Sequence, residues 1–558
     1  MAGRLTPPRI CPAVAAPDGF EAGTQTMANH PLRIVIAGGG TAGWMAAATF
    51  ARFLETGYEI DLIESDAIGT VGVGEATIPQ IHLFNDALGL DEDAFLRATG
   101  GTFKLGIEFV DWFKPGHRYM HAFGDVGRDV GLLPFHQYWL RARSLGLAGD
   151  LGAYSLNTHA ALANRMQRGP ARTARTLPSM PYAYHFDAAL YARYLRRYSE
   201  TRGVNRIEGK IVRVTRDGDS GDVSGLVLEN GTTVAADLYI DCTGFRGLLI
   251  EEALGTGYED WTHWLPCDRA IAVPSARSEA VTPYTRSTAH GAGWQWRIPL
   301  QQRMGNGLVY CSEFQQADDA ERELLANLEG APLAAPRHLA FTTGRRKLAW
   351  NRNVVALGLA SGFIEPLEST SIHLVQSGIA RLIALFPDRR FDPVERDEYN
   401  AQMHELYADV RDFVILHYKA TRRRDTPFWD RCRTMDIPDS LARKIALFRG
   451  KGRVFRENRE LFATTSWVSV CLGQDIVPQE YEPAVDALDE ERVAGALEEM
   501  RREYLDIAGR LPSHGDFLRH ISGQPAAPAV APAAPAAAAG PTFSFASESP
   551  FDFSADPL

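Results

Sequence analysis

Blocks of apolar and polar positions near the start of the chain predict a strand, a helix and a second strand. The run LRIVIAGG at 32–39 is typical of a buried strand. TAGWMAAATFARFLETG at 41–57 has the apolar spacing of a helix and ends at a glycine, and YEIDLIES at 58–65 is again typical of a strand. A strand, a helix and a strand within about 35 residues indicate a βαβ unit with parallel strands.

Later apolar runs predict further strands. Between 207 and 241 short runs alternate with the turn signals DGDSGD and ENG, which is typical of an antiparallel layer. Two apolar strands, within 237–244 and 353–362, each end in a turn of small residues. These two resemble the strands that return to the main sheet in FAD-dependent monooxygenase folds.

From residue 371 onward the apolar spacing favours helices. Asp392 can cap a helix whose first turn holds Pro393 and Glu395, a capping box. A second helix is predicted over 489–507, where apolar side chains recur at helical spacing. Its apolar positions are Val493, Leu497, Met500 and Tyr504.

Composition divides the chain into four parts and limits its location. We expect a disordered extension over 1–30, a cofactor-binding body over 31–375, a helical substrate-side region over 376–522 and a disordered Ala/Pro-rich tail over 523–558. No stretch of about 20 apolar residues predicts a membrane span, and the start lacks the apolar core of a secretion signal. These features predict a cytoplasmic protein.

Charge and cysteine usage exclude two further classes. The 558 residues include 58 Lys and Arg against 69 Asp and Glu, a net charge of −11, which argues against a nucleic-acid binder. The 6 cysteines are scattered without a metal-ligand spacing, so we expect reduced thiols and no metal site. His82, His185 and His373 are interpreted as structural histidines.

A glycine-rich turn between the first strand and helix predicts dinucleotide binding. Gly38 to Gly43 fits GxGxxG, and Glu64 ends the next strand, where an acid can accept hydrogen bonds from ribose hydroxyls. The glycines allow the backbone to approach a pyrophosphate at the helix N-terminus. The two returning strands favour FAD over NAD. No second GxGxxG is visible, so the reductant is expected from another protein.

Three further segments carry a resemblance to a known family. GWQWRIP at 293–299 contains WxWxIP, VGEATIP lies at 73–79 and FIEPLEST lies at 363–370. Together with GGGTAGW at 38–44 they resemble the flavin-dependent halogenases of the tryptophan-halogenase type, in order, over about 32–520. The resemblance implies a mixed α/β (α+β) fold, FAD-binding and monooxygenase-like, with the GxGxxG βαβ unit and a helical C-terminal substrate region.

The same resemblance implies an activity and its partners. An FADH2-dependent halogenase makes hypohalous acid from a flavin hydroperoxide and chloride or bromide. The halogen then reaches an electron-rich aromatic substrate, here indole or a tryptophan-like molecule. FADH2 would come from a separate NAD(P)H-dependent flavin reductase, with diffusion as one route, and the protein would be a monomer or homodimer. The implied FAD-binding residues are Gly38, Gly39, Gly40, Thr41, Ala42, Gly43, Glu64, Ser65, Ala76, Ile211, Leu359 and Ile372.

Lys104 and Glu368 match the family's catalytic positions. Lys104 lies between Phe103 and Leu105, and a desolvated lysine has a lowered pKa and a larger nucleophilic fraction. From local sequence alone, an amphipathic lysine whose stem covers apolar residues is the favoured interpretation, and the resemblance reverses this preference. Glu368 would polarise the halogen donor or accept the ring proton, although local sequence also fits an acid in a helix first turn.

Other matched positions concern the halide, the substrate and the path between them. The backbone of Thr370 and Ser371 would hold the halide, with serine where the family has glycine. His121 and Phe123 would stack on an aromatic substrate. Trp294 and Trp296 would form a tunnel wall between flavin and substrate. Packing alone explains His121 and Phe123 nearly as well, and from local sequence alone alternating tryptophans on a strand are normally core residues.

One segment departs from the family, and two other functions stay open. The stretch 449–467 does not match the lid that grips free tryptophan, which favours a more open mouth and substrates such as indole. The first alternative is a flavin-dependent aromatic hydroxylase, which needs the substrate beside the flavin. The second is a non-catalytic flavin-binding protein, against which the presence of both Lys104 and Glu368 argues.

Overall fold

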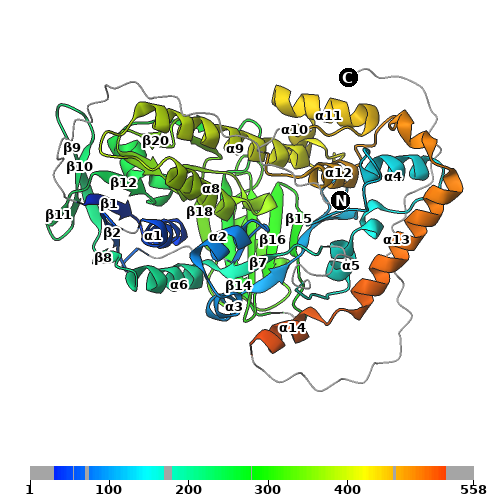
Figure 1. The fold of residues 1–558 in the computed structure, drawn as a ribbon, viewed down its shortest axis with the longest axis horizontal. Helices are drawn as coiled ribbons and strands as arrows, with labels where there is room; N and C mark the ends of the chain where they lie inside the picture. Colours follow the sequence, from blue (N-terminus) through cyan, green and yellow to red (C-terminus); the bar gives the residue numbers. More distant parts are fainter. Residues whose placement is uncertain are drawn as a thin grey trace, which may run out of the picture.

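The computed structural model describes residues 31–54, 56–68, 74–168, 179–277, 280–456 and 460–522. A mainly parallel sheet of six strands, in the order β20-β21-β12-β1-β2-β8, forms one part of the molecule (Figure 1). Its strands are β1 (Leu32–Ala37), β2 (Tyr58–Glu64), β8 (Asn205–Glu208), β12 (Leu238–Asp241), β20 (Trp350–Asn351) and β21 (Val354–Ala356). Helix α1 (Thr41–Phe53) connects β1 to β2, which pair in parallel.

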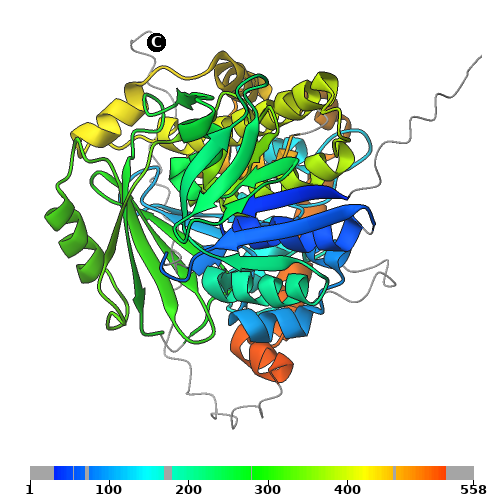
Figure 2. The same cartoon turned by 90° about the vertical axis from the view of Figure 1, so that its left-hand side faces the viewer.

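A second large sheet has seven strands in the order β18-β14-β17-β16-β15-β5-β6. They are β5 (Gly106–Val110), β6 (Arg118–Ala122), β14 (Arg269–Ser275), β15 (Thr285–Ala289), β16 (Gly293–Pro299), β17 (Met304–Tyr310) and β18 (Arg337–Ala340). Figure 2 shows the green strands of this sheet, β14 to β18, on one side and β1 and β2, in dark blue, on the other. The WxWxIP segment is β16, near the middle of this sheet.

Three small sheets complete the strand structure. The first is β11-β10-β9, the second β13-β19-β22 and the third β3-β7-β4. Their bounds are β3 (Gly74–Ala76), β4 (Thr102–Lys104), β7 (Ala183–Asp187), β9 (Ile211–Arg216), β10 (Val223–Leu228), β11 (Thr233–Val234), β13 (Tyr258–Asp260), β19 (Gly344–Arg346) and β22 (Gly362–Phe363). The third sheet carries Lys104 at the end of β4.

The α-helices cover the sheets and dominate the last third of the described chain. Besides α1, the helices before residue 330 are α2 (Ile81–Leu88), α3 (Glu92–Thr99), α4 (Phe135–Ser144), α5 (Leu156–Leu162), α6 (Ala188–Glu200) and α7 (Ala317–Ala326). The later ones are α8 (Ser371–Ala384), α9 (Pro393–Lys419), α10 (Pro427–Thr434), α11 (Asp439–Lys451), α12 (Thr464–Gly473), α13 (Glu490–Arg510) and α14 (His514–Ile521). In Figure 1, α13 runs along one end of the molecule and places α14 beside α3. There Arg97 donates a hydrogen bond to the carbonyl of Ile521.

The sequence signals explain where the later helices start. The Asp392 side chain accepts a hydrogen bond from the backbone of Val394, so the predicted cap of α9 is confirmed. Asp489 caps α13 by accepting from the backbone N–H of Arg492, and the predicted apolar face of α13 is buried at Val493, Leu497 and Tyr504.

The predicted βαβ unit and fold class are confirmed. The two returning strands are β12 and β21: β12 pairs in parallel with β1, and β21 pairs in parallel with β12 in the same sheet. The helix ends at Phe53, earlier than its predicted end at Gly57, because Leu54 already leaves the helical conformation with a ψ of 85°. Gly57 takes a φ of +83° just before β2. The predicted disordered ends, 1–30 and 523–558, lie outside the described residues.

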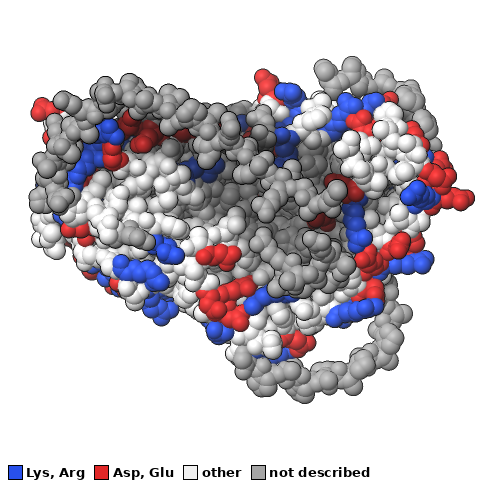
Figure 3. Space-filling view, viewed as in Figure 1, with Lys and Arg blue, Asp and Glu red and all other residues white. Residues whose placement is uncertain are grey.

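Membrane spans and metal sites are not found in the part of the chain that the structure describes. None of its helices is long and apolar enough to cross a membrane. Among the same residues no cluster of His, Cys, Asp and Glu could hold a metal ion, and their five cysteines are free. Acidic and basic side chains are interspersed on the face drawn in Figure 3.

The glycine at the start of α1 gives a test of the fold. A Cβ at Gly43 would lie 1.9 Å from the carbonyl oxygen of Gly38, whereas a Cβ at Gly40 would meet no atom within 4 Å. We therefore expect Gly43→Ala to lower the free energy of unfolding by about 1–3 kcal/mol, and Gly40→Ala to leave it nearly unchanged. Urea unfolding of the two variants measures the difference. Equal midpoints would contradict the close packing of α1 on the β1 turn.

Candidate active site

The GxGxxG turn has the shape that a dinucleotide needs. Gly38 takes a φ of +108° and its N–H bonds to the carbonyl of Ile63, so the chain leaves β1 in a tight turn. Gly40 is the N-cap of α1 and has no side-chain cap. The space beside its Cα is open. A free helix N-terminus behind an open glycine turn suits a pyrophosphate, so these residues fit FAD.

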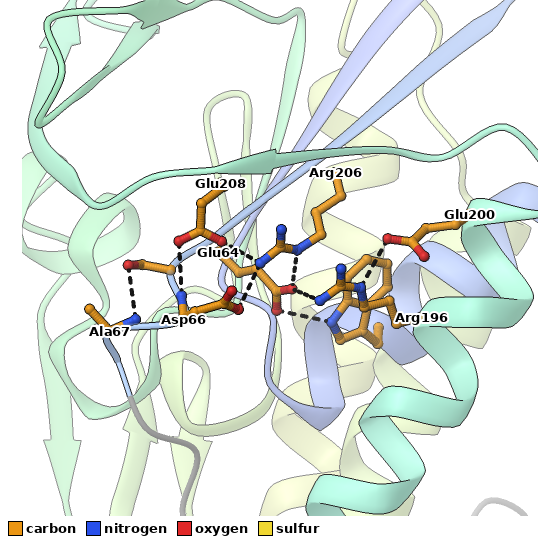
Figure 4. A network of polar contacts seen from close by, with 9 residues as sticks. Glu64, Asp66, Ala67, Arg196, Glu200, Arg206 and Glu208 are labelled. Carbon is orange, nitrogen blue, oxygen red and sulfur yellow. Dashed lines mark hydrogen bonds and ion pairs between the residues drawn. The ribbon is translucent and has the colours of Figure 1, made fainter.

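Glu64 is held at this turn by a network of cations (Figure 4). Its Oε1 accepts hydrogen bonds from Arg206, at 2.5 Å, and Arg196, at 3.1 Å. Its Oε2 accepts from the indole N–H of Trp44. The carboxylate also lies against Gly39. The structure therefore places the predicted ribose-binding acid at the turn and fixes it with two arginines that sequence reasoning missed.

The other predicted cofactor residues lie on several different elements of the fold. Gly358 approaches Ala42 of α1 so closely that a Cβ would lie 2.9 Å from the alanine Cβ, which brings Leu359 to the start of α1. Ile372 is buried in the first turn of α8. The remaining three are Ser65 after β2, Ala76 in β3 and Ile211 at the start of β9.

Lys104 is fully buried at the end of β4. Its ammonium group donates to the carbonyl of Thr77, at 3.0 Å, and to the hydroxyl of Ser369, at 2.7 Å. The nitrogen lies 5.2 Å from the centre of the Phe123 ring. Burial lowers the pKa of Lys104 to about 7, against the opposing charge on Glu368. A large fraction of this lysine is therefore a neutral amine at neutral pH.

Glu368 is buried between two histidines. Its two oxygens lie 3.1 and 3.0 Å from His121 Nδ1. His417 Nε2 lies 2.8 Å from Oε1, at ion-pair distance although not aligned as a hydrogen bond. Burial alone would raise the pKa of Glu368, but the two histidines outweigh it and lower the pKa to about 2. The carboxylate is thus charged in the same pocket that holds Lys104.

The segment after Glu368 presents polar groups at the start of α8. Ser369 takes a φ of +60°, which turns the chain so that its hydroxyl faces Lys104. Thr370 is fully buried and its hydroxyl has no partner among the described residues. Ser371 begins α8, whose N-terminus lacks a side-chain cap. An unpartnered hydroxyl at a helix N-terminus fits a halide ion.

Aromatic side chains surround Lys104 and Glu368 on the side of β6 and α9. His121 lies beside Glu368, and its ring centre lies 5.8 Å from that of Phe413 on α9. Phe413 stacks on Phe462 at 3.7 Å and meets Trp467 edge-on at 4.9 Å. Sequence reasoning named His121 and Phe123 here but missed the other three rings.

Trp294 and Trp296 project from the same face of β16. Their ring centres are 6.1 Å apart, and both are buried. A Cβ at Gly307 on the neighbouring strand would lie 2.0 Å from the Trp296 ring, so this glycine makes room for the indole. Trp294 donates its N–H to Glu365, at 2.6 Å. The two tryptophans therefore lie next to the segment that carries Glu368.

His514 brings the end of the described chain to the strand of Lys104. Its Nε2 accepts a hydrogen bond from the backbone N–H of Phe103, and its Nδ1 donates to the carbonyl of Val281. Burial lowers the pKa of His514 to about 4, so the neutral ring supports both bonds. No motif points to this residue, because its partners lie hundreds of positions away in the sequence.

Comparison with known proteins identifies the family. The family model described as tryptophan halogenase matches residues 33–490. The chain belongs to the tryptophan halogenase family.

Individual members of this family support the assignment. The tryptophan 6-halogenase of Streptomyces toxytricini is 35% identical over 517 residues, which cover 88% of this chain and 98% of that protein. A flavin-dependent halogenase from Xanthomonas campestris is 50% identical with a TM-score of 0.86, covering 89% and 100% of the two chains. One from Brevundimonas sp. BAL3 is 46% identical with a TM-score of 0.85, again covering 89% and 100%.

These comparisons confirm several predictions from the sequence. The recognised family, the FAD-binding fold class and the assignment as a flavin-dependent halogenase are confirmed. The residues that the family motifs indicated, Lys104, Glu368 and Thr370, are all buried, and Lys104 donates to Ser369, which lies between the other two in the sequence. Their roles stay predictions, and those of His417 and Ser369 are added to them.

The charge of Lys104 in this halogenase can be tested through stability. Between about pH 7 and pH 10 the unfolded chain binds a proton at Lys104 that the folded protein has lost, so wild-type stability rises with pH. Lys104→Met lacks this slope. We expect its unfolding free energy relative to wild type to fall by up to about 1.4 kcal/mol per pH unit in that interval.

Urea unfolding at pH 7, 8, 9 and 10 measures this slope. Lys114→Met is the matched control, because Lys114 is exposed. A constant difference between wild type and Lys104→Met would show that Lys104 is an ordinary ammonium in the folded protein.

Proposed function

We propose that the chain is an FADH2-dependent halogenase that transfers chlorine or bromine through Lys104 to an electron-rich aromatic ring. The carrying observation is the burial of Lys104 and Glu368 close enough for the carboxylate charge to act on the lysine, with a lowered pKa for each. Reduced FAD with oxygen would supply the oxidising equivalent that turns a halide into hypohalous acid. The residues from Gly38 to Gly43, with Glu64, would hold the cofactor.

The neutral amine of Lys104 is the chemical centre of this proposal. It can hold hypohalous acid by a hydrogen bond. It can also attack the halogen, so that a nitrogen–halogen bond forms and water leaves. Ser369 and the carbonyl of Thr77 orient the amine. Because the pocket is closed to solvent, the oxidised halogen stays at Lys104 until a ring carbon takes it.

Glu368 serves the aromatic step. Attack by the ring leaves a proton on the halogenated carbon, and a buried carboxylate nearby can accept it. His121 and His417 keep Glu368 charged and fix its orientation. Thr370 and Ser371 would bind the halide at the start of α8, where Thr370 has an unpartnered hydroxyl.

The reductant and the substrate come from outside the chain. A separate NAD(P)H-dependent flavin reductase would supply FADH2, consistent with a single GxGxxG in the sequence. The substrate ring would lie at His121 and Phe123, with Phe413, Phe462 and Trp467 as further apolar walls. Stacking on such walls favours indole and related rings.

Mass spectrometry of the products tests the proposed function. The protein is incubated with FAD, NADH, a generic flavin reductase, bromide or chloride, and indole, tryptophan or a phenol. We expect a halogen isotope pattern with wild type and its loss, by at least about 100-fold, in Lys104→Ala, because the halogen then has no carrier.

The control for this test is Lys114→Ala, an exposed lysine outside the pocket, which should keep full product formation. An oxygenated product without halogen would instead place the protein among the aromatic hydroxylases. Equal product from Lys104→Ala and wild type would refute the role of Lys104.

Substrate choice gives a separate prediction. The described part of the 449–467 segment offers apolar rings at Phe462 and Trp467, while the cation nearest Trp467, Lys444, is already paired with Glu460. We expect kcat/KM for indole to exceed that for free L-tryptophan by about tenfold, because the amino-acid group would lose water without gaining matched partners. Competition between the two substrates in one reaction measures the ratio. A preference for free tryptophan would contradict this expectation.

A further inference from the structure

A second buried acid lies beside the active site and takes no part in the mechanism above. Glu365 precedes Glu368 by three residues and has no exposed surface. Its Oε2 accepts two hydrogen bonds, from Trp294 Nε1 at 2.6 Å and from the hydroxyl of Tyr418 at 2.7 Å. Its Oε1 has no partner among the described residues. Both bonds therefore fall on one oxygen.

This arrangement fits a neutral carboxylic acid. A carbonyl oxygen has two lone pairs, and Oε2 uses two to accept two hydrogen bonds. Ionisation of Glu365 would place charge on Oε1 as well, a buried atom to which none of the described residues donates a hydrogen bond. Burial raises the pKa of Glu365 to about 7, and the two donors reduce that effect only in part.

The groups around Glu365 are neutral too. Besides Tyr418 on α9, the titratable side chains that face it are Cys267, ahead of β14, and Cys432 on α10. Burial raises the pKa of Tyr418 and of both thiols well above the usual values, so none carries charge at pH 7. No described cation lowers the pKa of Glu365, whereas two histidines lower the pKa of Glu368.

The partners of Glu365 connect it to both halves of the active site. Trp294 belongs to the tunnel wall on β16. Tyr418 follows His417, the α9 residue that contacts Glu368. One oxygen of Glu365 thus ties the wall, α9 and the catalytic segment together at a single point.

We propose that Glu365 is a positioning residue that locks Trp294 and Tyr418 in place and so keeps the oxidised halogen on the path to Lys104. This inference rests on the proposed function, because it assumes that hypohalous acid is made on one side of Trp294. Without the lock, the Trp294 indole can rotate and α9 can shift His417 away from Glu368. Oxidant then escapes before it reaches the aromatic ring.

The functional test compares Glu365→Gln with Glu365→Leu. The amide oxygen of glutamine can accept both hydrogen bonds, whereas leucine accepts none. Each reaction contains indole and a fast halogen scavenger that is too large to enter the protein, and the ratio of halogenated indole to halogenated scavenger is measured. We expect Glu365→Gln to match wild type and Glu365→Leu to lower the ratio by about tenfold at the same rate of flavin oxidation.

A second pair of variants tests the proposal independently, in case Glu365→Leu does not fold. Trp294→Phe and Tyr418→Phe each remove one donor to Glu365. Tyr418→Phe keeps its six-membered ring and Trp294→Phe keeps a smaller aromatic ring at that position, so each should lower the same ratio by a smaller factor than Glu365→Leu. An unchanged ratio in Glu365→Leu and in both Phe variants would overturn the proposal. Loss in Glu365→Gln as large as in Glu365→Leu would also overturn it, because glutamine keeps the lock.

Infrared spectroscopy tests the protonated state without any turnover. The difference spectrum of wild type minus Glu365→Gln should contain a carboxylic-acid C=O band at pH 5.5 that declines as the pH rises through 7. Absence of this band would overturn the neutral lock. If wild type halogenates neither indole nor the scavenger, the proposed function fails, and the infrared band still decides the state of Glu365.

Discussion

Burial of Lys104 is the constraint on which the rest of this site depends. An ammonium group without exposed surface has lost its hydration, and among the described residues the carbonyl of Thr77, the hydroxyl of Ser369, the charge on Glu368 and the face of the Phe123 ring compensate it in part. That partial compensation leaves the amine close to its neutral form at neutral pH. A fuller set of acceptors would hold the proton on the amine, so the proposed role of Lys104 requires a sparse set of partners.

The same constraint explains why the pocket is assembled from distant parts of the chain. Lys104 lies in a small sheet, His121 in a large one, Glu368 on a turn before α8 and His417 on α9. Packing of helices and sheets around a single centre excludes water on every side, which one local motif cannot do. The bond between His514 and the strand of Lys104 extends this enclosure to the last described helix.

Much of the fold and part of the site could be predicted from the sequence. The glycine turn from Gly38 to Gly43 and the caps of α9 and α13 are local signals, and each predicted the element that the structure contains. His417 could not be predicted, because it is one histidine on a long helix and only tertiary packing brings it to Glu368. Similarly, Glu64 was predicted from its spacing, but the arginines that hold it come from elsewhere in the chain.

Two glutamates three residues apart show how packing divides chemical roles. Glu368 has two histidines and is a carboxylate, while Glu365 has only neutral donors and favours the protonated acid. Environments that push two pKa values apart are the usual way in which a fold separates a base from a neutral group. Sequence spacing cannot assign these states, since both residues occupy one short motif. The contacts of neighbouring residues on α9, His417 and Tyr418, decide which acid is charged.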